Sequence, residues 1–397
     1  MQISSFWHIL LLPSPYFFKK YPIARNISLY LHLLKYKYTM DNRKIASDLL
    51  FRKAEETDIE RIWVIIGQAK EQMRRLNSHQ WDESYPALET ISQDIKIGNG
   101  YVFCKGNKVV AYGVISFDGE PVYKDIDGKW TNELPYMIVH RLAVADEMKR
   151  QGMAKRFMLE AEEVSRQKGI YNFRVDTNYD NEYMLHLIDS LGFQYTGEVR
   201  YRGNNIRKAF EKCIYPHVSS FGVPGYTIRE AIYEDAGIIF DAIDKNRDDL
   251  RTWLPFVDGL KSVGDEQAFL SSSLQVPYEE RDIVYMIEKG KSICGLIGFH
   301  FSDRANHRTE IGYWLLPEYR GKGLVTRAVH HLCLLALCEK GFNRIQIRCA
   351  IGNTASNAIP QRLGFKQEGT ERDGELLING EYTDINVYSL LKKDIAE

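Results

Sequence analysis

Glycine and basic residues follow an apolar run in the stretch YWLLPEYRGKGLVT, residues 313–326. Arg320, Gly321, Lys322 and Gly323 separate this predicted strand from a predicted helix. Glycines at such a junction let backbone N–H groups turn outward, and the helix adds the positive end of its dipole. Together these features form a site for phosphate. A tight turn without a ligand is the alternative for so short a motif.

Two better-known phosphate motifs do not fit this loop. A P-loop needs Ser or Thr directly after its GK pair, and a dinucleotide fingerprint needs a third glycine. The residues around Gly321 and Gly323 offer neither.

Composition limits the class of protein. At 397 residues and 46.0 kDa the chain exceeds one typical domain, so we expect two cores. A net charge of −1 disfavours a nucleic-acid partner, and no run reaches the roughly 18 apolar residues that span a membrane. The six cysteines are scattered without a CxxC pair, which predicts no disulfide framework, no metal site and a reducing, cytoplasmic location.

Residues 1–47 form a predicted leader. The run FWHILLLPSPYFF has no basic segment before it and is interrupted by Pro13 and Pro15, which disfavours a signal peptide. Met40 opens a stretch typical of a cytosolic N terminus, so we expect an over-extended translation start. A genuine leader is the alternative.

The rest of the chain repeats one order of elements. Residues 48–214 and 226–397 each read as strand, helix, hairpin, strand, glycine loop with helix, strand, helix and two closing strands. Between them, residues 215–225 hold two Pro, two Gly and two Ser, which predicts a linker.

The spacing of single residues supports the repeat. Asn181 and Asn353 each precede the glycine of an LGF triplet by 11 residues. Gly152 and Gly323 precede those same glycines by 40 and 41 residues. The sequence therefore predicts a tandem of two homologous α+β domains.

Both halves resemble the GNAT superfamily of N-acetyltransferases, whose motif is Q/R-x-x-G-x-G/A. Arg320, Gly323 and Val325 take its places in one half, and Lys149, Gly152 and Ala154 in the other. Lys149 and Val325 depart from the motif. The C-terminal half, through EIGYWLLPEYRGKGLVTRAV and GEYTDINVYSLLKKD, resembles the ribosomal-protein-serine acetyltransferases. The N-terminal half, with QWDESYP, resembles a general GNAT domain.

The resemblance implies a fold and a co-substrate. Each half should hold a mixed, mostly antiparallel sheet with two strands splayed beside the loop that binds acetyl-CoA. The residues implied to bind acetyl-CoA in the C-terminal half are Leu315, Arg320, Gly321, Lys322, Gly323, Leu324, Val325 and Asn353. Those in the N-terminal half are Val144, Lys149, Arg150, Gln151, Gly152, Met153, Ala154 and Asn181. The two asparagines can also cap the helices that follow them.

Acetyl transfer to an amine needs a base for the amine and benefits from an acid for the departing thiolate. In the C-terminal half the resemblance implies Glu310 or Glu375 as the base and Ser356 as the acid. Ordinary surface positions are the alternative for all three. Pro360, where many members have a tyrosine acid, agrees with the serine branch.

The N-terminal half departs further from the family. Met184 and Ile188 stand where an acid is expected, which leaves Tyr179, Tyr183 or no residue at all. His140, on a predicted strand, is one candidate base.

We therefore predict an N-acetyltransferase whose C-terminal domain acts on a primary amine. A protein N-terminal α-amine suits a single exposed carboxylate better than lysine, because it loses its proton nearer neutral pH. An aminoglycoside or polyamine is the alternative acceptor, and an N-terminal domain that binds acyl-CoA without catalysis is a further possibility. The oligomeric state is not predicted.

Overall fold

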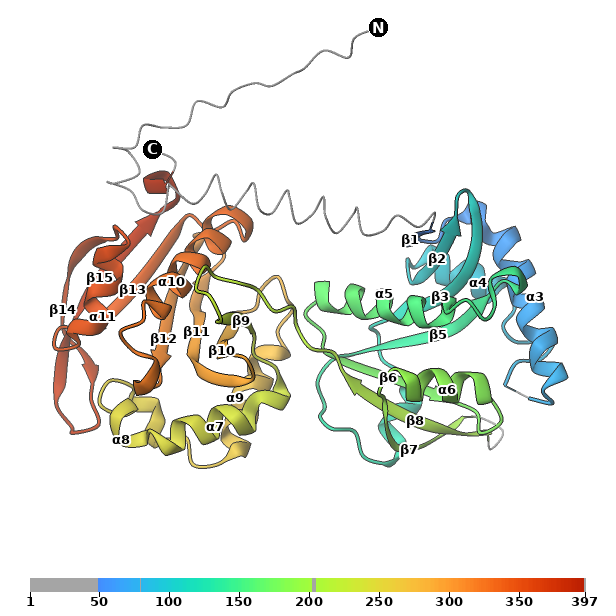
Figure 1. Ribbon diagram of the computed structural model, residues 1–397, viewed down its shortest axis with the longest axis horizontal. Helices are drawn as coiled ribbons and strands as arrows, with labels where there is room; N and C mark the ends of the chain where they lie inside the picture. The colour runs from blue at the N-terminus through green and yellow to red at the C-terminus, as the bar shows by residue number, and fades with distance from the viewer. Residues whose placement is uncertain (1–48, 79, 202–204, 396–397) are drawn as a thin grey trace, which may run out of the picture. The chain divides into compact units, whose positions relative to one another are not determined.

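The computed structural model describes residues 49–395 apart from 79 and 202–204 (Figure 1). The predicted leader, residues 1–47, lies outside this range. The described residues divide into two compact units: the chain up to His217 with Leu270–Arg281, and Val218–Phe269 with the chain from Asp282 onward. The division after His217 falls within the predicted linker, residues 215–225.

In the N-terminal half, every strand but β4 belongs to the predicted order. The strands are β1 (Leu49–Lys53), β2 (Gly100–Lys105), β3 (Lys108–Ser116), β4 (Asp127–Gly128), β5 (Tyr136–Val144), β6 (Asn172–Thr177), β7 (Gln194–Tyr201) and β8 (Asn205–Cys213). The helices are α3 (Ile59–Arg75), α4 (Leu88–Lys96), α5 (Met153–Gln167) and α6 (Glu182–Ser190).

These strands form one sheet, in the order β1-β2-β3-β5-β6-β8-β7-β4. All neighbours are antiparallel except β5 and β6, which are parallel. This parallel pairing is short, because it joins Tyr136–Ile138 to Asn172–Arg174 and stops there. The two strands then separate toward their carboxyl ends.

The C-terminal half repeats this arrangement. Its strands are β9 (Thr227–Glu230), β10 (Val284–Lys289), β11 (Ser292–Asp303), β12 (Arg308–Leu315), β13 (Arg344–Ala350), β14 (Lys366–Leu376) and β15 (Tyr382–Leu391). Its helices are α7 (Ala236–Lys245), α8 (Arg247–Leu250), α9 (Val263–Leu274), α10 (Leu324–Leu334) and α11 (Thr354–Arg362).

The second sheet has the order β14-β15-β13-β12-β11-β10-β9. Its parallel pair is β12 and β13, joined from Arg308–Glu310 to Arg344–Gln346 and separate beyond. Two separate mixed sheets, mostly antiparallel and each with one splayed pair, confirm the expected α+β fold class.

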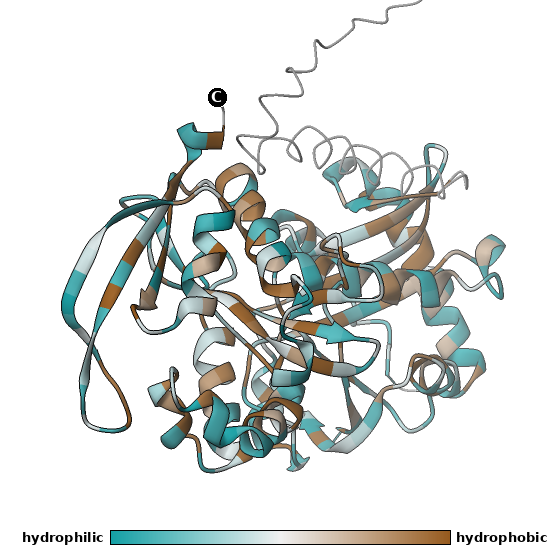
Figure 2. Ribbon diagram, turned by 60° about the vertical axis from the view of Figure 1, so that its left-hand side comes forward, coloured by the Kyte–Doolittle hydropathy of each residue, from teal (hydrophilic) through white to brown (hydrophobic). Residues whose placement is uncertain are grey.

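The first sheet is covered on both faces by apolar helix sides. Successive residues of a strand point to opposite faces. Accordingly Phe103 of β2 packs in a cluster with Phe157 of α5, whereas its neighbour Val102 packs with Ile62 and Ile66 of α3. Figure 2 shows hydrophobic residues, in brown, on strands and on helix sides, with hydrophilic residues, in teal, between them. The sheet is therefore held between α3 and α4 on one face and α5 and α6 on the other.

An arginine–aspartate pair fastens the first strand of each half to the turn that follows it. Arg52 makes two hydrogen bonds to the Asp58 carboxylate, at 2.7 and 2.9 Å. Arg229 does the same to Asp235, at 2.7 and 2.8 Å, and also contacts Glu288. Both pairs have a spacing of six residues. The repeat therefore extends to individual polar contacts that the sequence interpretation did not include.

Candidate active site

The loop from β12 to α10 holds glycines at two left-handed positions. Gly321 has φ 72° and Gly323, which caps α10, has φ 74°. Glycine adopts this conformation without steric cost. In the described backbone, the N–H groups of Gly321, Lys322 and Gly323 donate to no carbonyl oxygen. With the first N–H groups of α10 they can bind an anion.

The basic side chains of this loop are exposed but already have partners within the protein. The guanidinium group of Arg320 forms an ion pair with Asp249 of α8, and its Nε donates to the carbonyl oxygen of Leu315 at 3.2 Å. Nζ of Lys322 donates to the carbonyl oxygen of Glu318 at 2.6 Å. The anion-binding capacity of the loop therefore comes first from its backbone.

The loop from β5 to α5 has the same conformation. Gly152 caps α5 with φ 75°, as Gly323 caps α10. Arg150, two residues earlier, has φ 59° in the place that Gly321 has in the other loop. A non-glycine residue there costs about 1–2 kcal/mol.

Side chains of the N-terminal loop also contact their own turn. Nζ of Lys149 lies 2.5 Å from Oδ1 of Asp146, and Nε2 of Gln151 donates to the carbonyl oxygen of Glu147 at 2.9 Å. Both predicted loops are thus built alike, with a left-handed glycine at the helix cap and side chains that contact their own turn.

Asn353 and Asn181 cap the helices that follow the splayed strands. The side-chain oxygen of Asn353 accepts from the N–H of Ser356 at 3.1 Å, and that of Asn181 accepts from the N–H of Met184 at 3.1 Å. Nδ2 of Asn181 also donates to Gln80 at 2.8 Å. Their capping role is confirmed.

Ser356 belongs to a cluster of three polar side chains. Its Oγ lies 3.0 Å from the hydroxyl of Tyr313 on β12 and 3.1 Å from Sγ of Cys349 on β13. Burial raises the pKa of Tyr313, with the nearby Cys349 adding to the shift, so the phenol is protonated at neutral pH. Tyr313 was not among the predicted site residues, and its strand position alone gave no signal for it.

Glu310 stands where β12 and β13 separate. It is opposite Gln346 in the last pair that joins the two strands. Its Oε2 accepts from Nε2 of Gln346 at 3.3 Å, and its Oε1 lies 3.3 Å from Nε2 of His300. The side chain is 13 % exposed, so Glu310 is a largely enclosed carboxylate at the split.

Glu375 is exposed on β14, opposite Thr383 of β15. Within the described residues it makes no hydrogen bond or ion pair. Glu375 interacts with the charge of Arg348 on β13: burial lowers the pKa of Arg348, but Glu371 and the charges of Glu310 and Glu375 raise it. Glu310 and Glu375 are thus neighbours of one arginine.

The candidate acid and the candidate bases lie on opposite faces of the C-terminal sheet. Along β13, Gln346 and Arg348 are two residues apart and share the face of Glu310. Cys349 points to the other face, where it contacts Ser356. Beyond Glu310 and Gln346, β12 and β13 are no longer paired, and the two groups of side chains lie at this separation.

In the N-terminal half, the positions considered for the acid differ in their surroundings. Ile188 is buried in the core and Met184 packs against it, so neither can supply a proton. Tyr183 is 57 % exposed, and the hydroxyl of Tyr179 donates to Glu198, which raises the pKa of Tyr179 to about 12. Tyr179 and Tyr183 therefore lie on the surface of the domain.

His140 lines a cavity of about 420 Å³. Burial lowers the pKa of His140 to about 4, so its imidazole is neutral at pH 7. Its Nε2 lies 3.7 Å from Oε2 of Glu120, a residue from the loop after β3 that the sequence interpretation missed. No motif surrounds Glu120 that could have signalled it.

No helix in the described part of the chain is long and apolar enough to cross a membrane. Over the same residues, no group of three or more His, Cys, Asp or Glu side chains could hold a metal ion.

Comparison with known proteins matches each half separately. Residues 226–366 match the model of the acetyltransferase (GNAT) domain, and residues 68–193 match that of the acetyltransferase (GNAT) family. The Bacillus subtilis (strain 168) protein named "Putative ribosomal N-acetyltransferase YdaF" is 37% identical over 172 residues, which are 42% of this chain and 92% of that protein.

Two further relatives have the length of one half. The "Ribosomal-protein-serine acetyltransferase" of Escherichia coli (strain K12) is 28% identical over 151 residues, covering 38% of this chain and 84% of its own. A crystal structure described as a "Probable acetyltransferase" is 33% identical, with a TM-score of 0.42, and covers 45% of this chain and 98% of its own.

Proposed function

This chain belongs to the GNAT family of acetyltransferases, and on that premise we propose that its C-terminal half transfers acetyl from acetyl-CoA to the α-amine of a protein N terminus. Two relatives support this acceptor through their names, since one is a ribosomal N-acetyltransferase by name and the other a ribosomal-protein-serine acetyltransferase.

The loop before α10 fits the pyrophosphate of acetyl-CoA. The N–H groups of Gly321, Lys322 and Gly323, which donate to no carbonyl oxygen in the described backbone, are available to an anion, and the dipole of α10 adds positive potential at the same point. Arg320 adds less positive potential than a free arginine would, because its ion pair with Asp249 neutralises part of its charge. Leu324, Val325 and Asn353 would continue the site along the helix start and toward the split, beside Leu315 at the end of β12.

The ionisation of the acceptor favours an α-amine. A terminal amine has a pKa of roughly 7.7–8.0, whereas that of lysine is roughly 10.4, so at neutral pH the reactive neutral form of the terminal amine is about a few hundred times more abundant. A single carboxylate at the split, that of Glu310, is enough to take the proton of such an amine.

The residues of the C-terminal half can serve each step of the transfer. Glu310 accepts the proton of the amine as the C–N bond forms at the acetyl carbonyl carbon. The C–S bond breaks, and the sulfur takes a proton from the hydroxyl pair of Ser356 and Tyr313. Glu375 is the alternative base, because it shares Arg348 with Glu310.

One observation carries this proposal: the acid pair and Glu310 lie on opposite faces of the sheet, at the point where β12 and β13 cease to pair. A thioester lying in the split meets an amine from the face of Glu310 and the hydroxyl pair from the face of Ser356.

Turnover of acetyl-CoA by the full chain tests the proposal. The acceptors are a peptide with a free N-terminal serine, the same peptide acetylated at its N terminus but carrying one lysine, spermidine and kanamycin. A Gly152→Val background removes the contribution of the other half. We expect kcat/KM for the free peptide to exceed that for the lysine peptide by roughly a few hundred-fold. Faster turnover of spermidine or kanamycin in this background would contradict the proposed acceptor.

A further inference from the structure

The cavity beside His140 lies on the face of the first sheet where an acceptor is expected. Asp176 of β6 lies five residues before the capping Asn181, as Arg348 lies five residues before Asn353. Asp176 and His140 therefore lie on the face of the first sheet that corresponds to the face of Arg348 and Glu310 in the second sheet. His140 also follows the last paired residue of β5, Ile138, by two positions, so the cavity adjoins the split.

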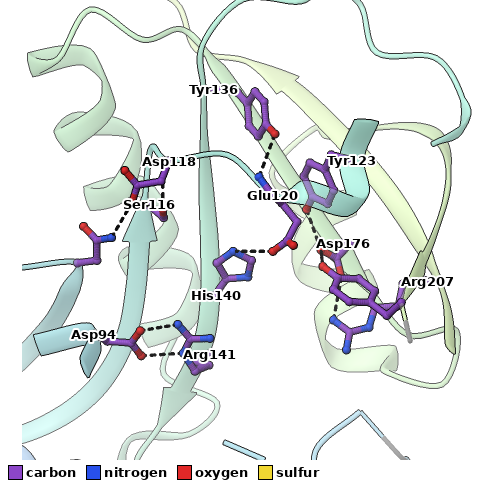
Figure 3. A network of polar contacts seen from close by, with 12 residues as sticks. Asp94, Ser116, Asp118, Glu120, Tyr123, Tyr136, His140, Arg141, Asp176 and Arg207 are labelled. Atoms are coloured by element: carbon purple, nitrogen blue, oxygen red, sulfur yellow. Dashed lines mark hydrogen bonds and ion pairs between the residues drawn. The ribbon is translucent and has the colours of Figure 1, made fainter. Parts of the chain in front are cut away.

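The two arginines of the cavity are already paired (Figure 3). Arg141 contacts both oxygens of Asp94 at 2.6 and 2.8 Å. Arg207 donates to Asp176 at 3.0 Å, and the same carboxylate accepts from the hydroxyls of two tyrosines. These guanidinium groups are thus matched by one carboxylate each.

Two further carboxylates at the cavity have no such match. Asp118 accepts hydrogen bonds from Asn99 at 3.2 Å and from Ser116 at 3.1 Å, both neutral donors. Glu120 has the neutral His140 as its nearest ionisable contact, at 3.7 Å. In the described part of the chain, neither carboxylate forms an ion pair with lysine or arginine. The cavity therefore carries excess negative charge, which favours a cation.

We propose that the N-terminal half is a second acetyltransferase whose acceptor is a small polycationic amine, with Asp118 binding a distant ammonium group and Glu120 taking the proton from the amine that reacts. This inference rests on family membership and on the cavity, and not on the acceptor proposed for the C-terminal half.

Glu120 is suited to this step by its surroundings. Its side chain is 19 % exposed, and its backbone N–H donates to the hydroxyl of Tyr136 at 3.1 Å, which fixes the loop. Burial, reinforced by Asp176, raises the pKa of Glu120, which strengthens it as a base. Asp118, by contrast, is exposed and lines the same cavity.

This transfer needs no side-chain acid. Glu120 takes a proton from the ammonium group, the amine nitrogen forms a bond to the acetyl carbonyl carbon, and the C–S bond breaks. The thiolate leaves and takes the second proton of the amine nitrogen, directly or through water, because Met184 and Ile188 offer none.

The test uses the full chain with Gly323→Val, which removes the cofactor loop of the other half. Release of CoA thiol is measured with spermidine, kanamycin and propylamine as acceptors. Spermidine and kanamycin separate a linear polyamine from an aminoglycoside, and propylamine is the singly charged control. We expect turnover with at least one of the polycations.

Two cavity variants and one control then locate the site. We expect Glu120→Gln to lower kcat roughly 100-fold or more. Asp118→Asn should raise KM for the polycation about 10-fold while leaving kcat, and KM for propylamine, unchanged. Glu133→Gln, an exposed carboxylate outside the cavity, should leave all constants unchanged.

Specific results would overturn the inference. Absence of turnover with both polycations in the Gly323→Val chain would mean that the N-terminal half binds acyl-CoA without catalysis. Wild-type constants in both Glu120→Gln and Asp118→Asn would exclude the cavity as the acceptor site. If Glu120→Gln fails to fold, Asp118→Asn provides the test, because it changes an exposed residue. A raised KM for the polycation with an unchanged kcat then supports the inference, and unchanged constants contradict it. The α-amine acceptor proposed for the C-terminal half is tested separately, in the Gly152→Val chain.

Discussion

The hydroxyl of Tyr313 lies 3.0 Å from Oγ of Ser356, and the two residues come from a strand and a helix on either side of the split. In the proposed mechanism, a proton passes along this pair, from the buried phenol through the serine, toward the departing thiolate.

The first prediction concerns this pair. Ser356→Ala should lower kcat for peptide acetylation by about 10- to 100-fold, because the departing sulfur loses its proton donor. Tyr313→Phe should give a smaller loss, since Ser356 can still donate. Calorimetry should show acetyl-CoA affinity unchanged in both. Cys349→Ala, which removes the third member of the cluster, is the control. Equal rates in all three variants and the wild type would remove the acid role from this cluster.

The second prediction separates the two candidate bases. Glu310→Gln should lower kcat roughly 100-fold, while Glu375→Gln should lower it less, because Glu375 is exposed and lies farther along the sheet on β14. Steady-state rates with the serine peptide provide the measurement, and Glu381→Gln in the next turn is the control. The reverse order of effects would assign the base to Glu375.

The third prediction concerns the glycine loops. Gly323→Val places a β-branched residue at φ 74°, a strained conformation, and should abolish acetyl-CoA binding at one of two sites. The space around its Cβ is open, so the loss would come from the backbone and not from a clash. Calorimetric stoichiometry should fall from two per chain to one. Gly152→Val should do the same at the other site, and an unchanged stoichiometry in either variant would show that its loop binds no cofactor.

The fourth prediction concerns stability. Arg229→Met leaves Asp235 and Glu288, both under a tenth exposed, as unpaired buried charges. We expect a loss of about 3–5 kcal/mol in the free energy of unfolding of the C-terminal half. Arg52→Met is the matched variant, and because Arg52 is 30 % exposed its loss should be smaller. Urea unfolding measures both, and a larger loss in Arg52→Met would contradict this account.

The fifth prediction concerns pH. The pKa of His140 is lowered by burial to about 4, whereas an unfolded histidine has a pKa of about 6.5. Between these values the unfolded chain binds a proton that the folded chain does not. Stability of the N-terminal half should therefore be highest above pH 6.5 and fall as the pH drops toward 4. In urea unfolding at pH 7 and pH 5, His140→Gln should show a smaller fall than the wild type and than the control His186→Gln. An equal fall in all three would mean that His140 does not contribute.

Strong local patterns made much of the fold predictable. The stretch YMIVHRLAV predicted a strand that the structure places at Tyr136–Val144, and the turn at Gly106–Asn107 predicted the hairpin of β2 and β3. The helix α9 was missed, because its serine run and scattered apolar residues give a weak helical period. In α4, the spacing of Ile91 and Ile95 was a usable signal that the interpretation did not include.

The candidate site was only partly predictable, for a physical reason. Glycine loops and capping asparagines are local, so Gly323 and Asn353 could be identified from spacing alone. The contact of Tyr313 with Ser356, and of Glu120 with His140, joins residues 43 and 20 positions apart in the chain. Such contacts depend on how strands pair and where they separate, and a single sequence does not contain that information.

Pairing ends early between β5 and β6 and between β12 and β13. Each sheet therefore has two unpaired strand edges in its interior. Beyond three paired residues, the facing backbone groups of these strands have no partner in each other. Their amide hydrogens should exchange with solvent sooner than those on the far sides of the same strands, which pair with β3, β8, β11 and β15. A ligand with amide groups of its own, lying in the gap, would complete the ladder. Binding and sheet completion would then be one event, and each half would be stiffer, and harder to unfold, while it is loaded.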